Sequence, residues 1–168
     1  MDYILSLGSN LGNRMNNLRR ARRAVACVRI PGSMLACAPV YATEPVDVPA
    51  RFNHLQFLNT VVRIASALQP RELLRYLHDI ELSLGRKRHA MRYGPRIIDI
   101  DIITVGDIEM DTPNLILPHP HAAVRRFVLQ PLAHLLPDMV LPGQRLPVRA
   151  LLAGLPISPR VTLHAIEW

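Results

Sequence analysis

The chain has 168 residues, of which 49% are hydrophobic and 20% are charged. This length and composition fit one folded domain over residues 1–168, and they exclude an intrinsically disordered chain or a scaffold that needs disulfides to fold. The formal net charge is +7, and all 20 lysines and arginines except Lys87 are arginine, which favours anionic partners such as phosphorylated molecules or nucleic acids. Outside residues 86–96, the same arginines are equally compatible with a solvated surface.

The first half of the chain predicts a β-α-β-β-α order. Three segments rich in apolar and β-branched residues predict strands: residues 2–7, 33–41 and 55–66. Two amphipathic helices are expected, one from Arg14 to just before Pro31, and one from Pro70 to the C-cap Gly85.

The second half predicts one strong strand followed by less regular segments. The strand runs from Ile97 to Val105, and a further helix is expected from Ala122 to Leu135. The complete order predicts an α+β fold of the ferredoxin-like βαββαβ type, an antiparallel sheet with helices on one face, plus a C-terminal helical or irregular extension. Because many of the prolines follow residue 112, we expect long loops over the far side of the sheet.

The sequence also indicates the cellular compartment of the protein. No apolar stretch approaches the roughly 20 residues of a membrane span, and the N-terminus lacks the basic and apolar regions of a signal peptide. Cys27 and Cys37 are isolated, which is typical of free thiols in a reducing compartment. We therefore expect a cytoplasmic protein without membrane contact.

Two carboxylates lie in the most clearly predicted strand, Ile97 to Val105. Asp99 and Asp101 are two residues apart, so both project from the same face. Carboxylates at this spacing suit Mg²⁺, which usually takes one or two of them together with substrate phosphates. The alternative is a polar strand edge paired with nearby arginines.

The segment before these carboxylates is strongly basic. Residues 86–96 hold five lysines and arginines and no acid, so cations and Mg²⁺ can converge on one polyphosphate. We expect this loop to be mobile until a nucleotide binds. No Gly-x-x-x-x-Gly-Lys-Ser/Thr motif is present, which excludes a P-loop, and His119 with His121 makes a poor zinc site. The pattern predicts an ATP-using transferase.

Residues 92–103 read Arg-Tyr-Gly-Pro-Arg-Ile-Ile-Asp-Ile-Asp-Ile-Ile. This segment resembles the signature of the 6-hydroxymethyl-7,8-dihydropterin pyrophosphokinase family, which transfers pyrophosphate from ATP to a pterin alcohol and releases AMP. Supporting blocks follow in the order of that family: residues 7–12, 41–45, 57–59, 117–120 and 125–132. The resemblance extends from residue 3 to about residue 142.

The resemblance implies two Mg²⁺ ions at Asp99 and Asp101, with ATP as co-substrate. It also implies a set of ATP contacts: Glu81, Arg86, Arg92, Arg96, Ile102, His119 and Arg125. Arg86 and Arg92 would share the catalytic role with the two aspartates. For Glu81, and for His78 one turn earlier, an ordinary helix-surface pair is the alternative.

The resemblance further implies a pterin site in which Phe57 and Phe127 stack on the ring and Asn59 bonds to its edge. The implied substrate contacts are Thr43, Glu44, Val46, Phe57, Asn59, Asp99 and Phe127. The expected partners are ATP and the hydroxymethyl-dihydropterin, and we expect a monomer.

Two alternatives remain at this stage. The first is a basic nucleic-acid-binding module on the same ferredoxin-like plan, although no strand is rich in the aromatic residues that stack on RNA bases. The second is a slow, degenerate paralogue, because residues 120–124 read Pro-His-Ala-Ala-Val where many relatives have polar or charged residues.

Overall fold

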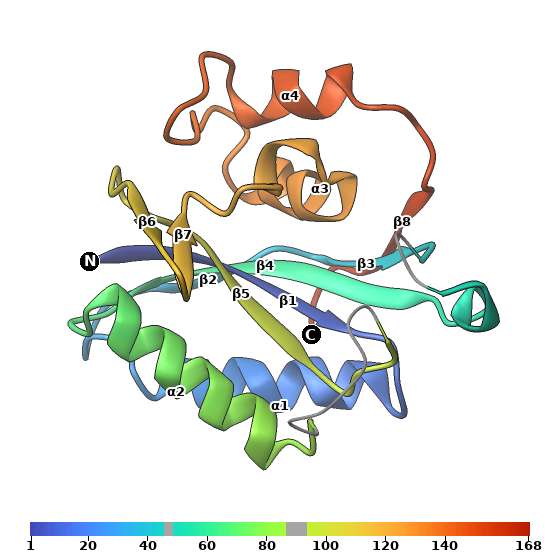
Figure 1. Ribbon diagram of the computed structural model, residues 1–168, viewed down its shortest axis with the longest axis horizontal. Coiled ribbons are helices and arrows are strands. Elements are labelled where there is room, and N and C mark those ends of the chain that lie inside the picture. The colour runs from blue at the N-terminus through green and yellow to red at the C-terminus, as the bar shows by residue number, and fades with distance from the viewer. Residues whose placement is uncertain (46–48, 87–93) are drawn as a thin grey trace.

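The fold is built around one antiparallel sheet. The structure is a computed structural model that describes residues 1–45, 49–86 and 94–168. The strands are β1 (Asp2–Ser9), β2 (Leu35–Cys37), β3 (Val40–Thr43), β4 (Phe57–Ala65), β5 (Asp99–Val105) and β8 (Val161–Ala165). They follow the spatial order β5-β1-β4-β3-β8, with β2 also paired to β4, so the longest strands lie side by side at the centre (Figure 1).

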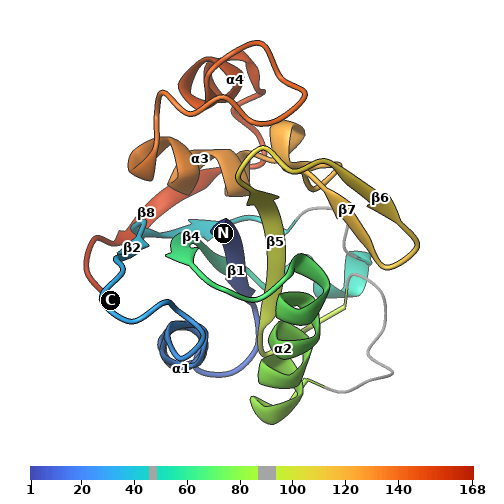
Figure 2. The ribbon, with the colours of Figure 1, turned by 90° about the vertical axis from the view of Figure 1, so that its left-hand side faces the viewer.

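Helices α1 (Arg14–Ala26) and α2 (Pro70–Ser83) cover one face of this sheet (Figures 1 and 2). The Asn13 side chain accepts a hydrogen bond from the Asn16 amide and so caps the start of α1. In the core between the layers, alternate β1 residues pack against apolar residues of the helices, all of them fully buried: Tyr3, Leu5, Leu7, Leu18, Leu73 and Leu77.

The opposite face carries a second layer made by the C-terminal third of the chain. Helices α3 (Arg126–Leu135) and α4 (Val148–Gly154) lie there, beside the hairpin of β6 (Met110–Thr112) and β7 (Leu115–Leu117). Short 3₁₀ turns are formed by Ala50–Phe52 and Ala122–Val124. A second apolar cluster joins α3 to the sheet through Ile4, Val61 and Ile103.

These observations confirm the predicted α+β fold and the order of its first six elements, with three differences. The expected strand 33–41 is two strands, separated at Ala38 and Pro39, where proline has no amide hydrogen to donate. The expected helix 122–135 begins only at Arg126. The far face is covered by α3 and α4 as well as by loops, and the sequence pattern predicted neither α4 nor β8.

The strand register places several polar residues in rows on the α3 side of the sheet. Gly8 pairs with Asp99 on one side and with Asn59 on the other, and Ser6 pairs with Asp101. Paired residues of neighbouring strands point to the same side of a sheet. Since Val61, which also pairs with Ser6, packs under α3, these residues face the α3 layer rather than α1 and α2.

Candidate functional site

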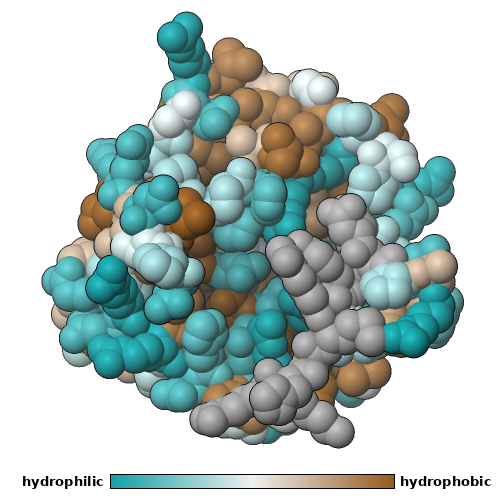
Figure 3. All heavy atoms as spheres, in the orientation of Figure 1, coloured by the Kyte–Doolittle hydropathy of each residue, from teal (hydrophilic) through white to brown (hydrophobic). Residues whose placement is uncertain are grey.

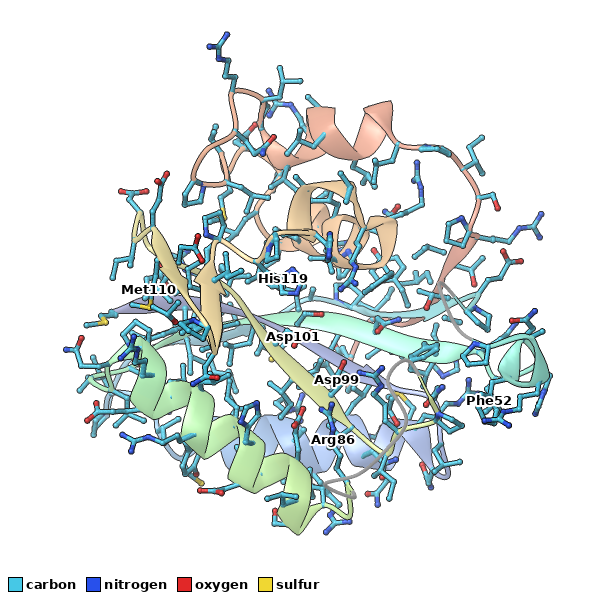
Figure 4. All side chains as sticks on the ribbon, viewed as in Figure 1. Phe52, Arg86, Asp99, Asp101, Met110 and His119 are labelled. Atoms are coloured by element: carbon cyan, nitrogen blue, oxygen red, sulfur yellow. The ribbon has the colours of Figure 1, made fainter. Side chains whose placement is uncertain are left out.

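The centre of the site is the pair of aspartates on β5. Ile100 between them is buried in the core, so Asp99 and Asp101 project together to the opposite side. Figure 4 shows the labelled side chains of His119, Asp101, Asp99 and Arg86 one after another along β5. The predicted shared face of the two carboxylates is confirmed.

The two carboxylates are neutralised differently. Asp99 Oδ1 accepts a hydrogen bond from Arg86 Nη1 and Asp99 Oδ2 accepts one from Arg96 Nη1, both at 2.5 Å. Asp101 has no ion pair within the described part of the chain. Burial, and secondarily the charge of Asp99, raises the pKa of Asp101 to about 6. Three cations oppose this rise: Arg125, Arg96 and Arg86. Among the described residues, Asp101 is therefore less fully neutralised than Asp99.

Glu81 belongs to the same network. It is only 4% exposed, and its Oε1 accepts hydrogen bonds from Arg86 Nη1 at 2.5 Å and from the Ile100 amide at 2.7 Å. Burial raises the pKa of Glu81 to about 7, even though the charge of Arg86 acts in the opposite direction. His78 is exposed on the outer surface of α2. The alternative of a surface pair is therefore wrong for Glu81.

His119 and Arg125 approach the aspartates from the α3 layer. The His119 amide donates to Ile103 O at 2.8 Å, which fixes this residue against β5. Burial lowers the pKa of its imidazole to about 4, and the charge of Arg125 adds to this effect. The ring is therefore neutral at pH 7, and because Nδ1 accepts from the His121 amide at 3.2 Å, Nε2 carries the proton. Arg125 lies over the Phe127 ring, 5.5 Å from its centroid.

A second group of polar residues lies beside Asp99. Asn59 Nδ2 donates to Thr43 Oγ1 at 2.6 Å, and both side chains are buried. A Cβ atom at Gly8 would lie 2.7 Å from Asn59 Oδ1, so only glycine leaves room for this amide. Phe57, two residues before Asn59, projects from the same face of β4 and is half-buried. A pocket of about 790 Å³ opens next to this group, between the segment after β1, Glu44 and residues 53–56.

Some of the expected contacts are not brought to the site or lie outside the described residues. The Ile102 side chain is buried in the α1–α2 core, on the side opposite to the aspartates. The Glu44 amide already donates to Arg160 O at 3.2 Å, and Glu44 Oε2 accepts from the Arg160 amide at 2.8 Å. Arg92 and Val46 lie outside the described residues, as does most of the basic loop.

One residue of this region, Asn10, was not expected from the sequence. The Asn10 amide donates to Arg96 O at 3.2 Å, and Asn10 Oδ1 accepts from the Arg96 amide at 2.7 Å. The only sequence signal was the matching block of residues 7–12, which by composition alone indicates a turn.

At the aspartates, the described residues supply only part of the ligand set of a metal ion. In residues 1–45, 49–86 and 94–168, no group of three or more His, Cys, Asp or Glu side chains could hold a metal ion. Two carboxylates with the remaining positions open to phosphate and water are the ligand set that Mg²⁺ usually takes. In the same part of the chain, no helix has the length and apolar character to span a membrane.

The fold and the site define a small α+β structure in which arginines and two partly buried carboxylates gather at β5. Figure 3 shows hydrophilic residues over this middle region, while hydrophobic residues gather above it, over α3 and α4. The family model of 7,8-dihydro-6-hydroxymethylpterin-pyrophosphokinase matches residues 4–137. The chain belongs to this family.

Individual relatives agree with this membership. The 2-amino-4-hydroxy-6-hydroxymethyldihydropteridine pyrophosphokinase of Pseudomonas aeruginosa is 41% identical over 156 residues, which cover 92% of this chain and 91% of the relative. A folate synthesis bifunctional protein of Arabidopsis thaliana is 41% identical over 135 residues, 80% of this chain. The chain spans only 27% of the length of that relative.

The solved structures agree in fold. A wild-type HPPK-DHPS of Plasmodium falciparum with pteroate superimposes with a TM-score of 0.67 at 14% sequence identity. The match covers 90% of this chain and 42% of that chain. At this identity the similarity shows the fold alone.

Proposed function

We propose that this chain transfers pyrophosphate from ATP to the hydroxymethyl group of 6-hydroxymethyl-7,8-dihydropterin. The observation that carries the proposal is the shared face of Asp99 and Asp101, with Arg86 and Arg96 bound to the first of them. It lies within the segment that matches the pyrophosphokinase family model, and relatives at about 40% identity carry the name of this activity.

In the reaction, the pterin hydroxyl oxygen bonds to the β-phosphorus of ATP while the bond from this phosphorus to the bridging oxygen of AMP breaks. The hydroxyl proton passes to water, and AMP and the pterin diphosphate are the products. Two Mg²⁺ ions held by Asp99 and Asp101 would supply charge neutralisation on the transferring group.

The side chains around the aspartates bind and orient the phosphates. Arg86 and Arg96 exchange their bonds to Asp99 for bonds to phosphate oxygens, which arginine forks bind strongly. Arg125 adds positive charge from the start of α3, and neutral His119 donates a hydrogen bond from Nε2. Glu81 keeps Arg86 close to the centre through the 2.5 Å bond. Among the described residues, catalysis therefore depends on position and charge rather than on a general base.

The pterin occupies the region of Asn59 and Thr43. Their mutual hydrogen bond leaves Asn59 Oδ1, beside Gly8, as an acceptor for the amino edge of the ring. Phe57 and Phe127 stack on the ring from the sheet and from α3, which contributes roughly 0.5–1.5 kcal/mol per ring beyond area burial.

The test is AMP formation from ATP, Mg²⁺ and the hydroxymethyl-dihydropterin. We expect AMP only when the pterin is present, loss of activity with EDTA, and a decrease of at least about 100-fold in Asp99→Asn and Asp101→Asn. Asp111→Asn, an exposed aspartate in β6, is the matched control and should keep full activity.

Unchanged AMP formation in both active-site variants would contradict the metal assignment. Trace activity in the wild-type chain would favour a degenerate paralogue, and RNA binding without AMP formation would favour the nucleic-acid module.

A further inference from the structure

The short segment after β1 has a geometry that its turn-like composition does not explain. Ser9 and Asn10 are almost fully buried, at 0% and 4% exposure. Three hydrogen bonds join them to Arg96 and Ile97, residues that are more than 80 positions away in the sequence.

Asn10 forms two of these bonds, and both reach the backbone of Arg96. Its amide donates to Arg96 O at 3.2 Å, and its side-chain Oδ1 accepts from the Arg96 amide at 2.7 Å. Ser9 Oγ donates to Ile97 O at 2.5 Å and is itself supported by Asn17 Nδ2 at 3.2 Å. Both backbone groups of Arg96 are therefore bound by Asn10.

The choice of asparagine at this position has an energetic cost. Asn10 Nδ2 is buried and has no hydrogen-bond partner within residues 1–45, 49–86 and 94–168. A buried donor without a hydrogen-bond partner is destabilising. An apolar residue would avoid this cost but would leave the Arg96 amide without its acceptor. An aspartate would keep an acceptor but would add a carboxylate to a region that already holds Asp99 and Asp101. Asparagine is the residue that provides a neutral acceptor.

Fixing the Arg96 backbone restricts the region that its guanidinium can reach. Arg96 Nη1 bonds to Asp99 Oδ2 at 2.5 Å, and the arginine side chain is only 17% exposed. An arginine whose backbone is fixed loses less conformational entropy when its guanidinium binds a phosphate.

We infer that Asn10 is a positioning residue, which holds Arg96 at the phosphate-binding centre by fixing its backbone. The inference rests on the proposed function for the role of Arg96, while the clamp itself is a property of the free protein. It gives Ser9 and Asn10 a role that is distinct from forming a turn.

The first measurement is hydrogen exchange at the Arg96 amide in the absence of ligands. In Asn10→Ala we expect exchange to be at least about tenfold faster than in the wild type, because the acceptor is removed. Asn10→Asp keeps an oxygen in the place of Oδ1 and is expected to retain slow exchange. It also serves as the second variant if Asn10→Ala does not fold.

The second measurement is the affinity for Mg²⁺ and α,β-methylene-ATP, by calorimetry. We expect Asn10→Ala to weaken binding by roughly 10- to 100-fold in the wild-type background. In the Arg96→Lys background the same change should cost less than about threefold, because residues that act together are not additive. Asn13→Ala removes one backbone hydrogen bond at the exposed start of α1 and should leave both readouts unchanged.

An equal loss of affinity in both backgrounds, or unaltered exchange at Arg96 in Asn10→Ala, would overturn the inference. Neither measurement needs the pterin reaction. If the wild-type chain binds the analogue but forms no AMP, the proposed function fails and the role of Asn10 is still decided by these data.

Discussion

At the scale of single residues, the carboxylates of the site differ in how fully arginines neutralise them. Asp99 has an arginine on each oxygen, Asp101 has none among the described residues, and Glu81 shares Arg86 with Asp99. Glu81 is buried, and its desolvation outweighs the attraction of Arg86, so its carboxyl holds a proton to higher pH than an ordinary glutamate. The free protein therefore contains a carboxyl group that titrates near neutrality.

Glu81 should make the stability of the free protein depend on pH. Its pKa is about 7 in the folded chain against an ordinary 4.5, so the folded state binds its proton more tightly. The resulting stabilisation is complete below about pH 4.5 and is lost as the pH rises through 7. We expect the free energy of unfolding to fall between pH 5 and pH 8 by an amount on the order of 2 kcal/mol more in the wild type than in Glu81→Gln. Urea denaturation at both pH values tests this, and parallel pH profiles would contradict it.

We expect pterin binding to require glycine at position 8. In Gly8→Ala the new Cβ meets Asn59 Oδ1 at 2.7 Å, so the amide must move and its bond to Thr43 is disturbed. We expect KM for the pterin to rise about tenfold or more, with a smaller change in KM for ATP, in steady-state kinetics. Gly154→Ala, where a Cβ meets nothing within 4 Å, is the control. A uniform loss of kcat without a change in KM would argue against this role.

At the scale of secondary-structure elements, one side chain of α3 binds the end of α4, in addition to the apolar packing between the two helices. Arg126, in the first turn of α3, donates hydrogen bonds to the carbonyl oxygens of Leu152, Leu155 and Pro156 at 2.6–3.2 Å. These carbonyls lie in the last turn of α4 or directly after it; Leu152 O also accepts from the Leu155 amide at 3.2 Å, and helix ends commonly leave carbonyls without an intrahelical partner. A guanidinium suits this place because it offers five donors and favours the negative end of a helix.

Arg126→Ala should therefore weaken the attachment of α4 to α3 without changing the contacts of Asp99 and Asp101. We expect the free energy of unfolding to fall by about 1.5–3 kcal/mol, as is typical of hydrogen bonds to a charged group. Arg149→Ala removes a surface ion pair with Asp138 in which both side chains are more than half exposed, and it should cost at most about 1 kcal/mol. Equal effects of the two changes in urea denaturation would refute the assignment.

At the scale of the whole molecule, the last residues of the chain form one edge of the sheet and contact α1. β8 pairs with β3 at the edge, and Trp168 Nε1 donates to Ala38 O at 2.8 Å. The Trp168 ring also packs against the first apolar cluster, with Arg22 of α1 at 4.7 Å from its centroid. This segment lies beyond the residues that match the family model, yet it joins the sheet edge to α1.

Trp168→Ala should destabilise the fold although it lies far from the site. Loss of the ring contacts and of the bond to Ala38 is expected to lower the free energy of unfolding by about 1–3 kcal/mol. Ile166→Ala, at a side chain that is 68% exposed, should change it by less than about 0.5 kcal/mol. Differential scanning calorimetry distinguishes the two, and a wild-type melting temperature in Trp168→Ala would show that the C-terminal contact is dispensable.

The sequence by itself determined the features that depend on local period and composition. Alternation placed Asp99 and Asp101 on one face, and the apolar periodicity gave α1 and α2, because side-chain direction repeats every two residues in a strand and about every 3.6 residues in a helix. The ordered motifs also sufficed for the family, since they specify residue types at fixed spacings.

Only the tertiary structure decided which distant groups meet. The buried carboxylate of Glu81 meets the Ile100 amide, and the backbone of Arg96 meets Asn10. The weak apolar pattern of Val161–Ala165 becomes a strand only because the edge of β3 is available to it. The reason is physical: hydrogen bonds between remote segments follow from strand register and packing, which no local pattern records.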